Sequence, residues 1–143
     1  MHTADTSSPH LSDDEILSAL ADLTLPPQHF DHRGHLRAAW IHLQRHPLEE
    51  ATTRTCDRIR AFAEHLGAST KYNHTTTEAL LRIMHARGAA DPARTFEAFL
   101  AENMDLVHDA RGVLRRHYSD ELLGSDHARR SFVLPDREPL PAP

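Results

Sequence analysis

Apolar side chains recur every three or four residues through most of this 143-residue chain, which is the spacing of one face of an α-helix. No stretch alternates apolar and polar residues as a half-buried β-strand does. The length suits one domain with a single core. The sequence therefore predicts an all-α fold, a single compact bundle of about four main helices with short C-terminal helices and an extended proline-rich tail.

The two ends of the chain differ in composition from its middle. Residues 1–11 are polar and are expected to be flexible, whereas residues 12–133 are expected to form the helical bundle domain. Residues 134–143 hold four prolines, so this C-terminal tail is expected to be extended rather than helical. Phe132 and Val133 are its expected apolar anchor as it wraps around the bundle.

Several helix starts are marked by side chains that accept hydrogen bonds from free backbone N–H groups. The marked starts are a Ser12–Glu15 capping box, Asp31 as an N-cap, a Thr75–Glu78 capping box, and the Asp91–Pro92 pair. Gly67 and Gly88 stand where two helices are expected to end, because glycine readily adopts the left-handed backbone that closes a helix.

The composition excludes several classes of protein. A formal charge of -5 and a pI of about 6.2 disfavour a general nucleic-acid binder. No apolar run reaches the ~18 residues of a transmembrane helix, and the first residues lack the basic start and apolar core of a signal peptide. The single cysteine, Cys56, excludes an internal disulfide and is expected to be a small buried residue. We therefore expect a cytoplasmic protein that binds neither nucleic acid nor membranes.

Histidine is the most unusual feature of the composition, with 13 residues where typical usage gives roughly 3. At 100° per residue, His32 falls inside the apolar stripe of the helix expected near residues 32–45, and His35 falls on its edge. Histidines three residues apart share a helix face and can bind one metal ion. The alternative is that His32 is a core histidine, hydrogen-bonded to a carbonyl or carboxylate. The metal interpretation predicts one transition-metal ion, namely copper, iron or zinc.

The segment K-Y-N-H-T-T-T-E, residues 71–78, is the second candidate region. Either Asn73 or His74 is the candidate third metal ligand, and the choice between them stays open. Lys71 adds positive charge at an expected helix start, where backbone N–H groups favour anions. Tyr72 is a candidate catalytic acid, base or lid, and Lys71 is the other candidate catalytic residue. Glu78 is expected on the solvent side of its helix, in the capping box.

These blocks resemble a family of small, largely uncharacterised bacterial all-helical proteins with the pattern F-x-H-x-x-H-L-x-x-A-W, K-Y-x-x-T-x-T and F-V-x-P-D. The matching residues are Phe30, His32, His35, Leu36, Ala39, Trp40, Lys71, Tyr72, Thr75, Thr77, Tyr118, Ser119, Ser125, Ala128, Arg129, Phe132, Val133, Pro135 and Asp136. The resemblance spans residues 30–136 and implies that His32, His35 and the Lys-Tyr block belong to one site. In the family, His and Glu follow the Lys-Tyr pair, whereas this chain has Asn73 and His74.

Two functions fit these candidates. The first is a metal-dependent enzyme acting on a small, anionic organic substrate, with oxidoreductase chemistry slightly favoured over hydrolase or lyase chemistry. Lys71, Arg129 and Trp40 are then the candidate substrate-binding residues, although Arg129 paired with Asp126 on the surface and Trp40 in the core are the simpler expectations. The alternative is a non-catalytic module that binds a small ligand or metal, or a protein-interaction bundle with structural histidines.

Overall fold

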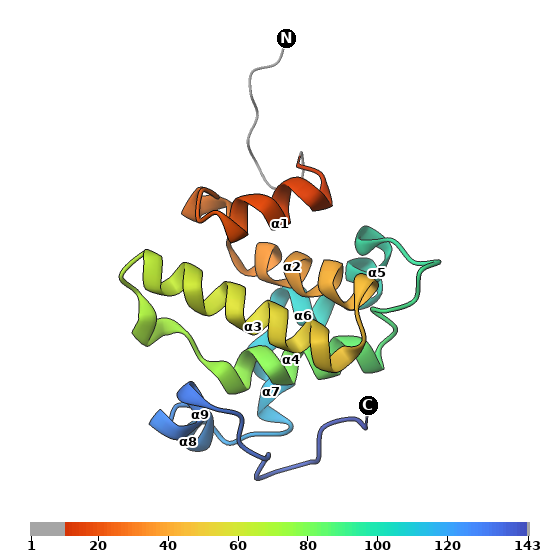
Figure 1. Ribbon diagram of the computed structural model, residues 1–143. Coiled ribbons are helices and arrows are strands. Elements are labelled where there is room, and N and C mark those ends of the chain that lie inside the picture. The colour runs from red at the N-terminus through yellow and green to blue at the C-terminus, as the bar shows by residue number, and fades with distance from the viewer. Residues whose placement is uncertain (1–10, 143) are drawn as a thin grey trace.

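Three helices, α2, α3 and α4, pack side by side at the centre of the protein (Figure 1). The structure is a computed structural model that describes residues 11–142. Its helices are α1 (Asp13–Ala21), α2 (His32–Arg45), α3 (Leu48–His65), α4 (His74–Ala86), α5 (Phe96–Glu102), α6 (Met104–His108), α7 (Ala110–Arg115), α8 (Asp120–Leu123) and α9 (Asp126–Arg130), with 3-10 turns at Pro27–His29 and Ser69–Lys71. The all-α prediction is confirmed, since these described residues contain no strand.

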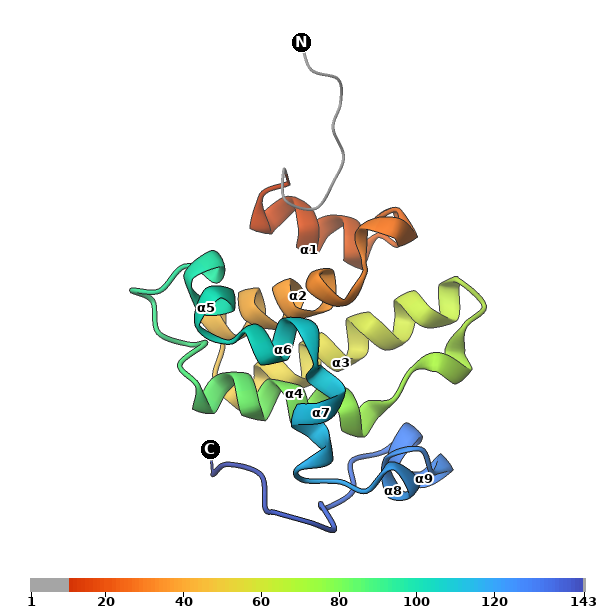
Figure 2. The ribbon, with the colours of Figure 1, turned by 180° about the vertical axis from the view of Figure 1, so that it is seen from behind.

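The shorter helices surround this central group. Helix α1 lies over α2 at one end of the molecule, and α8, α9 and the C-terminal tail lie at the other end, below α4 (Figure 1). Figure 2 shows α6 and α7 crossing the back of the group. The expected flexible N-terminus falls almost entirely on residues 1–10, which lie outside the described part of the chain.

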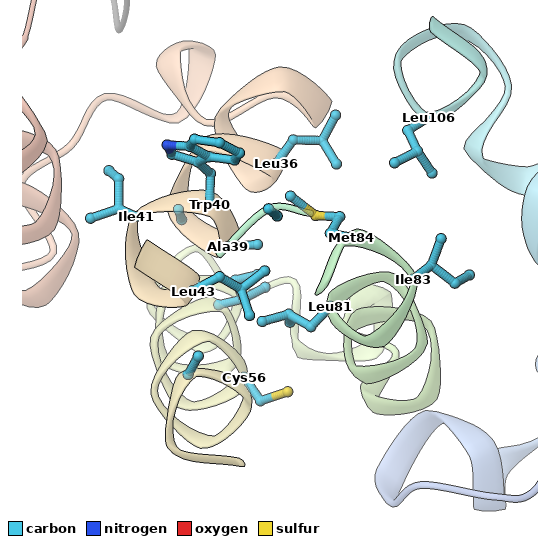
Figure 3. Close-up of a cluster of buried hydrophobic side chains, with 14 of the residues drawn as sticks. Leu36, Ala39, Trp40, Ile41, Leu43, Cys56, Leu81, Ile83, Met84 and Leu106 are labelled. Atoms are coloured by element: carbon cyan, nitrogen blue, oxygen red, sulfur yellow. The ribbon is translucent and has the colours of Figure 1, made fainter. Parts of the chain in front are cut away.

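The core is made by the apolar stripes of α2, α3 and α4. Leu36 and Leu43 of α2 are about as buried as Leu81 and Met84 of α4, with exposed fractions of 2% or less. Figure 3 shows Leu43 beside Leu81, and Cys56 reaching the same cluster from α3. Burying apolar area of this kind is the main stabilising contribution to folding. The expectation that Cys56 is buried is confirmed.

Two of the expected helix starts are confirmed, and two are wrong. Ser12 and Glu15 form the capping box of α1, and Asp31 caps α2 by accepting from Gly34 N. Helix α4 instead begins at His74, with Asn73 as its N-cap, so the expected Thr75–Glu78 box does not exist. Helix α5 begins after Thr95 rather than at Asp91–Pro92, because Asp91 closes a turn in which its carbonyl accepts from Arg94 N.

The tail is extended, as predicted, and it lies against α7 and α4. Tyr118 Oη donates to Val133 O at 2.7 Å, and Ser119 Oγ donates to Asp136 Oδ2 at 2.6 Å. Two backbone bonds, from the N–H of Arg137 and Glu138, continue this attachment. Within residues 11–142, no helix combines the length and the apolar character needed to cross a membrane.

Candidate functional site

A cavity of about 350 Å³ lies between α2, α3 and α4. Most of its lining is apolar, and Leu36, Ile59 and Met84 represent the three helices. Its polar lining consists of Asp31, His32, His35, Thr55, Thr76 and Thr77. A mostly apolar cavity of this size with a few converging polar groups is the usual form of a small-molecule site.

His35 lines this cavity, and a backbone hydrogen bond fixes which of its ring nitrogens carries the hydrogen. Its Nδ1 lies 2.8 Å from the carbonyl oxygen of Asp31. Because a carbonyl oxygen only accepts, Nδ1 carries the hydrogen and donates it. Burial lowers the pKa of His35 below its ordinary value of 6.5, so the ring is neutral near pH 7 and Nε2 is an acceptor. The ring also stacks on Phe30, with ring centroids 4.0 Å apart.

His32 lines the same cavity, but it is an exposed residue rather than a core residue. The expectation that it points into the core is therefore wrong. The reason is its position: His32 is the first residue of α2, so no preceding helical turn shields it. Its Nε2 lies 2.7 Å from Leu106 O on α6 and donates there, because a carbonyl oxygen only accepts.

Helices α3 and α4 supply the facing wall. Thr55 is fully buried, and its hydroxyl lies 2.9 Å from Nδ1 of the buried His42. Thr76 and Thr77 come from the first turn of α4, where the Thr77 hydroxyl donates to Asn73 O. Thr76 and Thr77 are not among the candidate site residues of the sequence analysis, because only Thr75 of the Thr-Thr-Thr run was given a role there, as a helix cap. That run, on a helix facing two histidines, was the available signal.

Neither candidate third ligand joins the two histidines. Both ends of the Asn73 amide are engaged: its Oδ1 accepts from Thr76 N at 2.9 Å and its Nδ2 donates to Leu123 O at 2.7 Å. His74 lies 2.9 Å from the Tyr72 hydroxyl through Nδ1 and 3.3 Å from Glu78 Oε1 through Nε2. Among residues 11–142, no group of three or more His, Cys, Asp or Glu side chains is placed to hold a metal ion.

Glu78 is not on the solvent side of α4, so that expectation is wrong. Its side chain is 14% exposed and accepts from Arg82 at 2.7 Å. The cause is tertiary packing, because α9 packs on α4 and Phe132 of the tail lies under the Arg82 guanidinium. The helical periodicity of α4 alone does not indicate that another part of the chain covers this face of the helix.

The two candidate catalytic residues stand apart from the cavity lining. Lys71 is exposed in the 3-10 turn before α4. Tyr72 is buried, and burial together with neighbouring Cys56 raises the pKa of its phenol well above the ordinary value of 10. A phenol with so high a pKa is poorly matched to general-base work near pH 7. Tyr72 instead connects α3 and α4, since the Arg60 guanidinium of α3 lies over its ring and its hydroxyl lies 2.9 Å from Nδ1 of His74 on α4.

The remaining candidates are also placed by the structure. Arg129 pairs with Asp126 at 2.6 Å on α9, which is the simpler of the two expectations. Trp40 is 5% exposed and packs against Phe96 and Phe99 of α5, so its expected place in the core is confirmed. Trp40 also lines a second cavity, distinct from the one that contains His32 and His35.

Comparisons with known proteins add no family to this geometry, since no family model, curated protein or solved structure matches the chain. Several of the residues that match the family pattern nevertheless contact one another. Tyr118 donates to Val133 O, and Ser119 donates to Asp136. Thr75 bridges Ser131 and Val133 by donating to the first and accepting from the second. These C-terminal residues hold the tail, whereas His32 and His35 line the cavity.

Proposed function

We propose that this protein binds a small, mostly apolar organic molecule in the cavity between α2, α3 and α4. The observation that carries the proposal is a cavity of about 350 Å³ whose apolar lining is interrupted by two imidazoles, each with one nitrogen held on a backbone carbonyl. Small-molecule pockets commonly measure about 300–1,000 Å³. His32 and His35 are the residues that orient the ligand.

The lining also indicates the chemical class of the ligand. Among residues 11–142, the cavity is lined by no lysine or arginine, and the one carboxylate in this lining, that of Asp31, is engaged as the cap of α2. A cavity without cations offers nothing to offset the lost hydration of an anionic group. The acceptor nitrogen of His35 instead suits a neutral molecule that donates an O–H or N–H hydrogen bond. This class differs from the anionic substrate that the sequence suggested.

A titration with phenol tests the proposal, because phenol combines an apolar ring with a single O–H donor. Binding is followed by two-dimensional amide NMR of the full chain, with toluene as the comparator without a donor. We expect phenol, with a dissociation constant on the order of 1 mM, to shift amides of α2, α3 and α4 around the cavity. Toluene is expected to bind about tenfold more weakly, because it lacks one hydrogen bond.

Variants separate the role of the histidine from simple filling of an apolar space. His35→Phe keeps a flat ring on Phe30 but removes the acceptor, so phenol affinity is expected to fall to that of toluene. Leu80→Trp puts a larger side chain into the lining and is expected to abolish binding. His65→Ala, an exposed position at the end of α3, is the matched control and should bind phenol normally. Absence of any cavity shifts in the native chain would overturn the proposal.

A second candidate function is supported by the same two imidazoles. Metal-binding histidines usually donate their other ring N–H to a carbonyl or carboxylate, which fixes the tautomer and the ring direction. His32 and His35 both have this arrangement, one helical turn apart. We propose as this alternative that they hold one copper, iron or zinc ion, with other coordination positions left for water or the bound molecule. Such a site would support a metal-dependent oxidoreductase or hydrolase.

Metal content per chain tests this alternative. Protein purified without chelator or affinity tag is analysed for copper, iron and zinc, beside His32→Ala, His35→Ala and the control His65→Ala. About one equivalent in the native chain and the control, lost from both α2 variants, would support the metal site. Less than a tenth of an equivalent after reconstitution would eliminate it and leave the phenol experiment unaffected.

A further inference from the structure

A second cavity, of about 540 Å³, lies on a neighbouring face of α2. We propose that this cavity binds a small organic carboxylate with a flat apolar body. It is bounded by α2, the first turn of α1 and the segment that enters α5. Helix α5 lies beside α2 in both ribbon views (Figures 1 and 2). The proposal is independent of the cavity that contains His32 and His35.

Three guanidinium groups line this cavity and provide the chemistry for a carboxylate. Arg33 and Arg37 lie one turn apart on α2, and Arg94 precedes α5. The flat guanidinium presents two parallel N–H groups that match a carboxylate, which a lysine ammonium does not. Stacking on aromatic rings restrains two of them: Arg33 lies 5.4 Å from the centroid of Phe96, and Arg94 lies 5.5 Å from that of Phe99.

The acidic partners of these arginines are side chains that reach solvent, while Arg37 and Arg94 each also donate to a backbone carbonyl, of Leu11 and of Arg87. Arg33 pairs with Glu97, whose side chain is 72% exposed, and Arg94 pairs with Glu102, whose side chain is 61% exposed. Arg37 is the most buried of the three, at 15%, and pairs with Asp13, which is 51% exposed. Ion pairs with an exposed carboxylate contribute little to stability, so those carboxylates can turn into solvent when a ligand carboxylate enters.

Aromatic side chains provide the surface for the apolar body of the ligand. Trp40 and Phe96 both line the cavity, and their ring centroids lie 5.9 Å apart. Only 5% of Trp40 is exposed, so the two packed rings form one narrow apolar wall, and a flat body lying against that wall gains by burying its apolar area. Trp40 was a candidate substrate-binding residue in the sequence analysis, and this proposal gives it that role. The anion-binding residues beside it are Arg33 and Arg37 rather than Lys71 and Arg129.

Trp40 also reports directly on binding, because it is the chain's single tryptophan. The experiment titrates the full chain with benzoate and follows tryptophan fluorescence, using benzyl alcohol as the neutral comparator and acetate as the carboxylate without a ring. We expect a saturable change with benzoate, and affinities for the comparators at least tenfold weaker. Equal responses to benzoate and benzyl alcohol would overturn the carboxylate assignment.

Two variants with opposite expected effects make the test specific. Arg37→Met should weaken benzoate binding about tenfold, through loss of one charged hydrogen-bond donor. Asp13→Asn removes the carboxylate that competes for Arg37, and is expected to strengthen binding severalfold. This gain is informative even if Arg37→Met does not fold. Arg129→Met, at the other end of the molecule, is the matched control, and His35→Phe should leave benzoate binding unchanged. No saturable change in either the native chain or Asp13→Asn would overturn the site.

Discussion

His42 is buried beside Thr55, and its ring is held in the neutral form. Burial, with smaller contributions from His46, Arg54 and Arg58, lowers the pKa of His42 to about 4 from its ordinary value of 6.5. In the unfolded chain the ring regains the ordinary pKa, so between pH 6.5 and about 4 the unfolded state binds more protons. The free energy of unfolding is therefore expected to fall as pH decreases through this window, by at most roughly 3 kcal/mol from His42.

Urea unfolding at several pH values between 7.5 and 4 measures this loss. His42→Gln retains a polar group for Thr55 but does not titrate, so its stability should depend less on pH than that of the native chain. His65→Gln, which changes an exposed histidine, should follow the native pH dependence. If the free energy of unfolding depended on pH equally in the native chain and in His42→Gln, the predicted contribution of His42 would be contradicted. His35, whose pKa burial also lowers, adds a dependence of the same sign to both.

At the scale of single residues, the sequence predicted that His32 and His35 lie close together, but not the burial or the hydrogen-bond partner of His32. Helical spacing placed His32 and His35 on one face, and both line the same cavity. Helical spacing also placed His32 in the core, whereas it is exposed at the start of α2. A bond to a carbonyl was one of the expected alternatives, but the sequence did not indicate that the carbonyl is that of Leu106 on α6. That contact joins residues 74 positions apart, a separation at which local periodicity carries no information.

Helix α4 shows how a tertiary contact decides where an element begins. The sequence offers two caps, Asn73 and Thr75, and the local rules favour Thr75 because Glu78 completes a capping box. The Thr75 hydroxyl is instead used by the tail, donating to Ser131 O and accepting from Val133 N. The chain therefore begins α4 at His74 and caps it with Asn73. The caps of α1 and α2 involve only local bonds, and the sequence was sufficient to predict these two.

Asn73→Ala is expected to lower the free energy of unfolding by about 2 kcal/mol, roughly half from the lost cap and half from the lost bond to Leu123 O. Asn73→Ser keeps an oxygen for capping but is too short to reach Leu123, so its loss should be about half as large. Urea unfolding followed by circular dichroism gives both values. Equal losses in the two variants would mean that the cap of α4 contributes nothing. Thr70→Ala, an exposed position in the preceding turn, is the control.

At the scale of the whole molecule, the tail joins elements that are distant in sequence. Val133 accepts from the Tyr118 hydroxyl and donates to Thr75, so one residue connects the region after α7 to the first turn of α4. Burial raises the pKa of Tyr118 to about 12, so its phenol keeps the proton that it donates. Prolines predicted that the tail is extended, but which groups it meets depends on the packed bundle. The sequence therefore predicted the shape of this element and not its attachment.

If the tail is part of one cooperative unit, removing it destabilises the whole bundle rather than a local segment. A chain that ends at Ser131 leaves the Tyr118 hydroxyl without an acceptor and uncovers apolar surface against which Val133 packs. Its free energy of unfolding is expected to fall by about 2–4 kcal/mol, still in a single transition. A chain that ends at Leu140 keeps Val133 and Leu140, the partly buried apolar residues of the tail, and should unfold like the native chain. Urea unfolding, followed in parallel by circular dichroism and Trp40 fluorescence, compares the three. Unchanged stability of the shorter chain would show that the bundle does not depend on its tail, whereas separated transitions would show that the tail covers a subdomain of its own.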